Sequence, residues 1–242
     1  MQLKLKFLLT GTGRCGTNYM ARFMTNLGIN CGHEAIFDHQ GIDTAIKRLD
    51  GRSKIQTSHC SIHDIAKNKP IESWFSAENI VAECSYMATP YLSHPCLSEC
   101  KVIHVIRNPL LTLGSFAIDV KFFDPQDIHQ VPWRNFVLSH MPEILNEKSI
   151  IEKTCRYLIN WNRKIEQCKL PMIKIRMEDY PFANLYNFLG IKQPDKTLEN
   201  KKINSWKKRK RELTLDDIPS GKTKDEFAML VRDYGYNTVK LL

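Results

Sequence analysis

A chain of 242 residues with 43% hydrophobic and 25% charged residues can bury a sizeable core, as one generous domain or one domain with insertions. No apolar run approaches the roughly 18 residues of a membrane span, and Arg14 interrupts the apolar start, so we expect neither a spanning helix nor a signal peptide. The net charge of +9 favours an anionic ligand, substrate or surface. We expect a single cytoplasmic domain, residues 1–242, whose eight cysteines are reduced thiols.

The N-terminal segment combines a strand, a glycine-rich loop and the start of a helix. Apolar residues from Leu3 to Leu9 predict a buried strand, and helical spacing from Tyr19 to Leu27 predicts a helix. Between them lies Gly11-Thr-Gly-Arg-Cys-Gly-Thr-Asn18. This order directs backbone N–H groups and the positive end of a helix dipole at one point, which suits a phosphate-like anion. Arg14 adds a positive charge with forked donors, while an ordinary tight turn is the alternative.

The loop has the spacing of a Walker A motif, Gly11-x4-Gly16, but not its last residues. Thr17 and Asn18 stand where a nucleotide triphosphatase has Lys followed by Ser or Thr. We therefore expect a loop that binds an anion without the residues that hold terminal phosphates and magnesium.

The region after the first helix gives weaker signals. Residues 29–37 are expected to leave the sheet through Cys31-Gly-His-Glu34, and residues 38–75 show no firm pattern. Within them, residues 54–58 could form a short strand that ends at His59.

Two further strands are predicted over residues 80–84 and 101–106, where the apolar residues are dense. A loop with Ser85 follows the first of them. The second leads into Arg107-Asn-Pro109, and a proline in the first turn suits the helix predicted after it.

Helices and a further strand are predicted to alternate in the C-terminal half. Residues 122–147 carry Pro125, Pro132 and Pro142 among aromatic residues and histidines, which indicates a long ordered loop or lid. Helices are predicted over residues 150–168, 182–189 and 224–234, and a strand over 172–176.

Two clusters have weaker interpretations. Cys96-x3-Cys100 with His94 resembles half of a metal site, but no second pair completes it, so no metal is expected. Residues 201–211 contain seven basic residues around Trp206, which indicates either a solvated face or the lining of a nucleotide cleft.

Strands that alternate with helices predict an α/β fold of three layers, α/β/α, with a mostly parallel central sheet. Ligands of such sheets bind beyond the carboxyl ends of the strands. The glycine-rich loop, Cys84-Ser85 and Arg107 all follow predicted strands, so we expect them to converge.

Two of these motifs resemble the sulfotransferases that use 3′-phosphoadenosine 5′-phosphosulfate. Gly13-Arg-Cys-Gly-Thr-Asn18 resembles the 5′-phosphosulfate loop of that family. Arg107-Asn-Pro109, with Ser115 eight residues after Arg107, resembles its 3′-phosphate motif. The two motifs are most similar to those of the family members that modify glycans or protein tyrosines and of the bacterial members.

Three later stretches resemble the family more loosely: 172–179, 187–190 and Asn204-Ser-Trp206. The chain also departs from the family pattern. Cys15 stands where a serine is common, and the late Arg-Lys-Gly element of the cytosolic branch is not visible.

The resemblance implies an enzyme that transfers a sulfuryl group from 3′-phosphoadenosine 5′-phosphosulfate to an acceptor hydroxyl without a metal, leaving adenosine 3′,5′-bisphosphate. The 5′-phosphosulfate would then be bound by Arg14 and by the loop residues that follow it, Cys15, Gly16, Thr17 and Asn18. Arg107 and Ser115 would bind the 3′-phosphate, while Ser85 and Trp206 are further candidates for donor binding. The acceptor class, a glycan, tyrosine or small alcohol, and the oligomeric state stay open.

A transfer to a hydroxyl needs a general base. Glu34 is the first candidate, because Cys31-Gly-His-Glu34 resembles the Cys-Gly-Glu-Glu stretch of tyrosylprotein sulfotransferases, whose second Glu is the base. His33 and His59 are the rivals, and the residues could instead stabilise a turn.

Two other classes of function stay open. A P-loop small-molecule kinase would use Arg14 at the phosphates and Glu83 for magnesium, but it gives Arg107 and Ser115 no role. A non-enzymatic polyanion-binding module would use residues 201–211, although it lacks the interleaved aromatic and basic pattern of single-strand binders, and no nucleic-acid partner is expected.

Overall fold

The computed structural model describes residues 3–55, 76–77, 79–179, 182–193 and 213–237. His59, Trp206 and the basic run 201–211 lie outside the described residues, as does most of the strand expected over 54–58.

The described residues form an α/β fold around a five-stranded sheet whose pairings are all parallel, which confirms the predicted fold class. The strand order is β2-β3-β1-β4-β5, so the first strand lies at the centre, with β3 and β2 on one side and β4 and β5 on the other. The strands are β1 (Phe7–Gly11), β2 (Cys31–His33), β3 (Ala82–Cys84), β4 (Lys101–Ile106) and β5 (Met172–Arg176).

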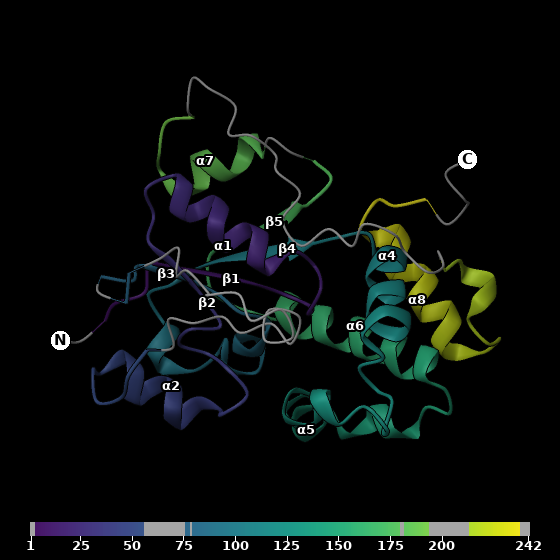
Figure 1. Cartoon of the computed structure of the whole chain (residues 1–242). Coiled ribbons are helices and arrows are strands. Elements are labelled where there is room, and N and C mark those ends of the chain that lie inside the picture. The colour runs from purple at the N-terminus through teal and green to yellow at the C-terminus, as the bar shows by residue number, and fades with distance from the viewer. Residues whose placement is uncertain (1–2, 56–75, 78, 180–181, 194–212, 238–242) are drawn as a thin grey trace.

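Helices cover both faces of this sheet (Figure 1). Strand residues alternate between the two sides: Leu9 and Ile103 belong to one buried cluster, and Leu8 and Val102 to the other. The first cluster contains α1 (Thr17–Asn26) and α7 (Ala183–Leu189), and the second contains α2 (Ile42–Leu49), α4 (Pro109–Gly114), α5 (Val131–His140), α6 (Ile150–Glu166) and α8 (Lys222–Asp233).

The sequence-based expectation for residues 29–37 was wrong at its centre. Cys31–His33 forms β2, which pairs in parallel with β3 at the edge of the sheet. Three residues are too short for a hydrophobic alternation to appear, so only the pairing partner reveals the strand.

The long loop expected over 122–147 was also wrong. The segment contains α5 and two short 3-10 turns, and Phe136, Val137 and Ile144 are buried. Pro132 and Pro142 lie in the first turns of these elements, where a missing N–H costs no helical hydrogen bond. The prolines therefore mark helix starts here.

Among the described helices, none has both the length and the apolar character needed to cross a membrane. The seven cysteines within the described ranges are free thiols, and five of them are buried. In the same part of the chain, no three His, Cys, Asp or Glu side chains are grouped closely enough to hold a metal ion. His94 instead accepts a hydrogen bond from the backbone N–H of Cys96, and the Cys100 thiol donates to the Leu5 carbonyl.

Candidate active site

The glycine-rich loop joins β1 to α1 at the carboxyl end of the central strand. Its conformation needs two residues with left-handed backbone, Arg14 at φ 64° and Gly16 at φ 111°. Glycine adopts this region freely, but an arginine there is uncommon and costs about 1 kcal/mol or more. No side chain caps the N-terminus of α1, and its first turn contains no acidic residue. The start of this helix therefore keeps its positive character.

Arg107 and Ser115 both contact Arg14. The Nε of Arg14 donates to the Ser115 hydroxyl at 3.2 Å, and the Nη1 of Arg107 donates to the Arg14 carbonyl oxygen at 3.0 Å. Arg107 follows β4, the neighbour of β1, and Ser115 begins a π-helical turn, Ser115–Val120, after α4. Helical turns of this rare type occur often at functional sites. Arg107 and Ser115 are 93 and 101 positions from Arg14 in the chain, yet both contact it, as expected.

Burial lowers the pKa of Arg14, and the nearby carboxylates of Asp119 and Glu34 oppose this effect. Arginine nonetheless stays charged at any physiological pH. Two arginines therefore converge on the loop that leads into the uncapped start of α1: Arg14 belongs to the loop, and the guanidinium of Arg107 binds its backbone.

Glu34 lies immediately after β2 and also has left-handed backbone, with φ 52°. Its N–H donates to the Cys84 carbonyl oxygen at 3.2 Å, which extends the pairing of β2 with β3. The pKa of Glu34 is raised to about 8, mainly by burial and further by the carboxylates of Glu83 and Asp38, while Arg14 opposes the rise. A carboxyl group that titrates near neutrality beside a buried cation suits proton transfer.

Three side chains hold the turn that carries Glu34. The Oε1 of Glu83 accepts hydrogen bonds from the N–H groups of Ile36 at 2.9 Å and Phe37 at 3.4 Å. The Ser85 hydroxyl donates to the Phe37 carbonyl at 2.7 Å. From α2, the Nη1 of Arg48 donates to the Ile36 carbonyl at 2.8 Å. The backbone polar groups of this buried turn are thus satisfied by side chains from β3 and α2.

Ser85 therefore lies beneath the turn. It is fully buried, and its oxygen also accepts a hydrogen bond from the N–H of Met87 at 3.1 Å. In this arrangement Ser85 stabilises a buried loop, and its binding of the donor stays a prediction.

His33 points toward the start of α1. Its Nε2 is 3.1 Å from the Thr17 hydroxyl, and the histidine is 5% exposed. Thr17 belongs to the predicted anion-binding loop, so this contact joins β2 to that loop. The rival base is therefore close to the loop, but it is engaged with one of the loop's own side chains.

Cys15 and Asn18 complete the loop. Cys15 is almost fully buried, and this burial raises the pKa of its thiol to about 12, so the group is neutral and contributes no charge. The Oδ1 of Asn18 is buried and has no hydrogen-bond partner within the described structure. Such an atom costs free energy unless a ligand or water satisfies it.

The large aromatic side chain of Trp161 is part of the core. It is fully buried in α6, and its indole N–H donates to the Tyr86 carbonyl at 3.2 Å. Trp161 therefore packs in the core, as apolar residues of an amphipathic helix commonly do.

The sequence analysis gave no supporting role to Glu83, which it named only as a magnesium ligand of a kinase, and it did not single out Arg48 or Asp38. Arg48 and Asp38 form a buried ion pair at 2.8 Å, with side chains 5% and 3% exposed. One signal was present in the sequence: Glu83 is a charged residue within the predicted interior strand 80–84. A carboxylate at such a position is rare unless hydrogen bonds satisfy it, which indicates a dedicated role.

Comparisons of the chain with protein-family models and with curated proteins found no match. The function therefore has to follow from the chemistry of the site.

Proposed function

We propose that this protein is a sulfotransferase that moves a sulfuryl group from 3′-phosphoadenosine 5′-phosphosulfate to an acceptor hydroxyl. The observation that carries the proposal is the meeting of Arg107 and Ser115 with Arg14. A donor with phosphates at both its 3′ and 5′ positions needs two anion-binding elements in one site. The loop supplies one, and Arg107 and Ser115, which lie on either side of α4, supply the other.

The residues present fit such a donor. Two guanidinium groups, an uncapped helix start and the unsatisfied amide oxygen of Asn18 surround the loop. The first two favour phosphate oxygens, and the asparagine oxygen can accept from a hydroxyl or an amino group. The donor supplies an activated sulfuryl group, and the protein supplies position and charge.

In the proposed transfer, the Glu34 carboxylate accepts the proton of the acceptor hydroxyl while that oxygen forms a bond to sulfur. The bond between sulfur and the phosphate oxygen breaks, and its electron pair stays on the bisphosphate. Arg14 stabilises the charge that develops on this leaving oxygen. Positioning and charge stabilisation supply most of the rate acceleration, as in phosphoryl transfer.

The kinase alternative receives less support from the geometry. Its magnesium ligand would be Glu83, but that residue is fully buried and one of its oxygens binds two backbone N–H groups. The sulfotransferase proposal needs no such ligand.

Thermal unfolding with three ligands tests the proposal. Adenosine 3′,5′-bisphosphate should raise the melting temperature of the wild-type protein without magnesium; at 100 times its Kd, a ligand stabilises by about 2.7 kcal/mol. A kinase would respond to ATP with magnesium instead, and a polyanion-binding module to heparin alone. No response to the bisphosphate would refute the proposal.

Two variants then separate binding from transfer. Arg107→Ala should abolish the stabilisation by the bisphosphate. Glu34→Gln should keep it and lower transfer from labelled donor to a library of hydroxyl acceptors by about 10²–10⁴-fold. Arg52→Ala, which removes an exposed cation that pairs with Asp50, is the matched control and should change neither readout. Full transfer by Glu34→Gln would move the base assignment to His33 or His59.

A further inference from the structure

The buried hydroxyl of Tyr157 binds the backbone of the glycine-rich loop. Tyr157 lies on α6 and is fully buried, and its hydroxyl oxygen accepts a hydrogen bond from the Gly13 N–H at 3.0 Å. Gly13 immediately precedes Arg14, whose backbone is left-handed at φ 64°. Such a backbone persists only where the surrounding structure holds it. A hydrogen bond from the protein core therefore ends beside the strained residue of the loop.

The ring of Tyr157 contacts the second element that meets Arg14, the π-helical turn Ser115–Val120. Its centroid lies 5.2 Å from that of Phe116, the second residue of this turn. Phe116 in turn packs closely against Gly13, because a β-carbon on this glycine would lie only 2.7 Å from the Cζ of Phe116. Tyr157, Phe116 and Gly13 thus contact one another in all three combinations, and these contacts join α6, the turn and the loop.

The hydroxyl of Tyr157 is not required by the packing of its ring. The ring lies among further aromatic residues, with centroid distances of 5.2 Å to Trp161, 6.0 Å to Phe123 and 6.3 Å to Phe122. A phenylalanine ring could make the same contacts. Without the hydroxyl, however, the Gly13 N–H would lose its partner in the interior of the protein. The residue type at position 157 is therefore explained by the loop and not by the core.

We propose that Tyr157 is a positioning residue for Arg14. Its hydroxyl fixes Gly13, and its ring fixes Phe116. The loop and the π-helical turn are thereby held at the separation that lets the Nε of Arg14 donate to the Ser115 hydroxyl. The effect on donor binding rests on the proposed sulfotransferase function, but the positioning of Arg14 does not.

Tyr157 performs this role as an uncharged group on a well-defined helix. Burial raises the pKa of Tyr157 well above its ordinary value, and the hydrogen bond from Gly13 opposes the rise. The hydroxyl is therefore neutral at physiological pH and adds no negative charge that would repel an anion at the loop. Its helix, α6, has 17 residues and begins with a capping box between Ser149 and Glu152. Groups carried on helices are held more precisely than groups on loops.

The test follows the Nε–H group of Arg14 by NMR in ¹⁵N-labelled protein, with Arg14→Met identifying the signal. Tyr157→Phe keeps the ring but removes the acceptor of the Gly13 N–H. We expect the Arg14 Nε–H signal to change its chemical shift and its exchange with water to become about tenfold faster. Tyr91→Phe is the matched control: it removes a tyrosine hydroxyl that binds His140 at 3.1 Å, and it should leave the Arg14 signal unchanged.

An Arg14 signal that is unchanged in Tyr157→Phe would overturn the proposal. A loss of stability alone accelerates exchange through unfolding but does not move the chemical shift of the folded protein, so the shift separates positioning from a purely structural role. Phe116→Leu provides a second variant should Tyr157→Phe fail to fold. It shortens the ring between Tyr157 and Gly13 and should also move the Arg14 signal, and an unchanged signal would again contradict the proposal.

Binding of the bisphosphate measures what the positioning of Arg14 contributes to the proposed function. Tyr157→Phe should raise the Kd for adenosine 3′,5′-bisphosphate about tenfold, while Tyr91→Phe keeps the wild-type value. A wild-type Kd in Tyr157→Phe, with a displaced Arg14 signal, would contradict the effect on donor binding. If the wild-type protein does not bind the bisphosphate, the proposed function fails, while the Arg14 signal still decides the positioning.

Discussion

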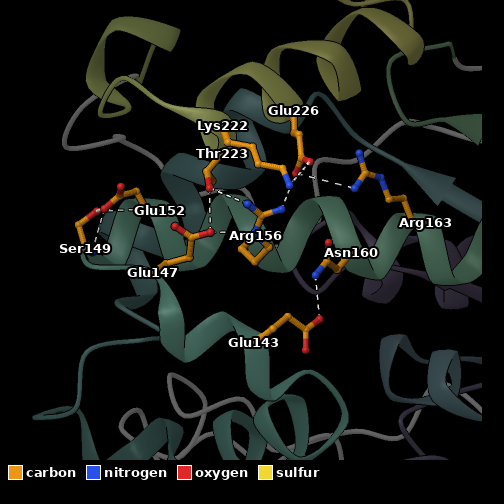
Figure 2. Close-up of polar contacts among 10 residues, drawn as sticks. All are labelled: Glu143, Glu147, Ser149, Glu152, Arg156, Asn160, Arg163, Lys222, Thr223 and Glu226. Carbon is orange, nitrogen blue, oxygen red and sulfur yellow. Dashed lines mark hydrogen bonds and ion pairs between the residues drawn. The ribbon is translucent and has the colours of Figure 1, made fainter.

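Two polar regions of this molecule differ in how their charged side chains are paired. Between α6 and α8, Arg156 lies among Glu147, Glu226 and Thr223, and each of its hydrogen-bonding nitrogens has a partner (Figure 2). Thr223 also donates to Glu147 at 2.7 Å, which closes the network. The side chains of the ions are only 15–19% exposed. Opposite charges alternate here, so burial is compensated.

The candidate site brings like charges together instead. Two arginines meet at the loop, and the carboxyl groups of Glu34 and Glu83 both have pKa values raised mainly by burial. Two of its residues, Arg14 and Glu34, also hold left-handed backbone that costs free energy. The α6–α8 network therefore stabilises the fold, while the candidate site keeps backbone strain and uncompensated charge that a bound anion and a proton can relieve.

Arg14→Met should give the largest effect. Removing the cation that faces the leaving oxygen should lower transfer by about 10²–10³-fold. Because Arg14 is a partly buried cation beside a second arginine, its loss should leave the melting temperature unchanged or raise it. Activity and thermal unfolding of the same preparation check both statements, with Arg52→Met as the control. A melting temperature that falls as far as that of Arg156→Met would show that Arg14 is structural.

Arg156→Met should have the opposite profile. It leaves Glu147 and Glu226 without their shared cation, so the free energy of unfolding should fall by about 2–3 kcal/mol. Binding of the bisphosphate by the folded protein should not change. Urea unfolding measures the loss, and addition of Glu147→Gln to the same chain should recover part of it. No recovery in the double variant would contradict the charge explanation.

The sequence could predict the central strands because their signals are local. Residues 101–106 and 172–176 are strands with the expected bounds, and the strand–loop–helix order of the N-terminus is also observed. The convergence of Arg107 on the loop followed from one topological rule, that parallel strands present their carboxyl ends at the same edge. Ser115 was expected there only from the resemblance to the sulfotransferase motif.

The supporting shell of the site could not be predicted in the same way. Arg48, Glu83 and Ser85 meet the turn after β2 through single contacts between elements that are distant in sequence. β2 itself was missed, since three residues at a sheet edge carry no periodicity. Such contacts depend on strand register, and register appears only when the sheet is assembled.

Glu34→Gly should stabilise the protein relative to Glu34→Ala by about 1 kcal/mol, because both variants lack the carboxylate but only glycine adopts φ 52° without strain. Urea unfolding of the two variants at one pH isolates the backbone contribution. Equal stabilities would mean that the turn relaxes when the side chain is shortened, and that the comparison between a strained site and a relaxed network overstates the strain.

The smallest expected effect concerns pH. Glu34 and Glu83 have pKa values raised above the ordinary range, mainly by burial, so the folded protein binds more protons than the unfolded chain between about pH 4.5 and 8. Their contribution to stability is therefore fully present below the unfolded pKa and is lost as the pH rises through the folded values. Wild-type protein should lose about 1 kcal/mol or more from this source between pH 5.5 and 8. A double variant with Gln at both positions should lose less over the same range, whereas Glu143→Gln should keep the wild-type slope. Parallel slopes in all three proteins would place the carboxyl pair in contact with bulk water, and the site would then differ from the α6–α8 network in geometry alone.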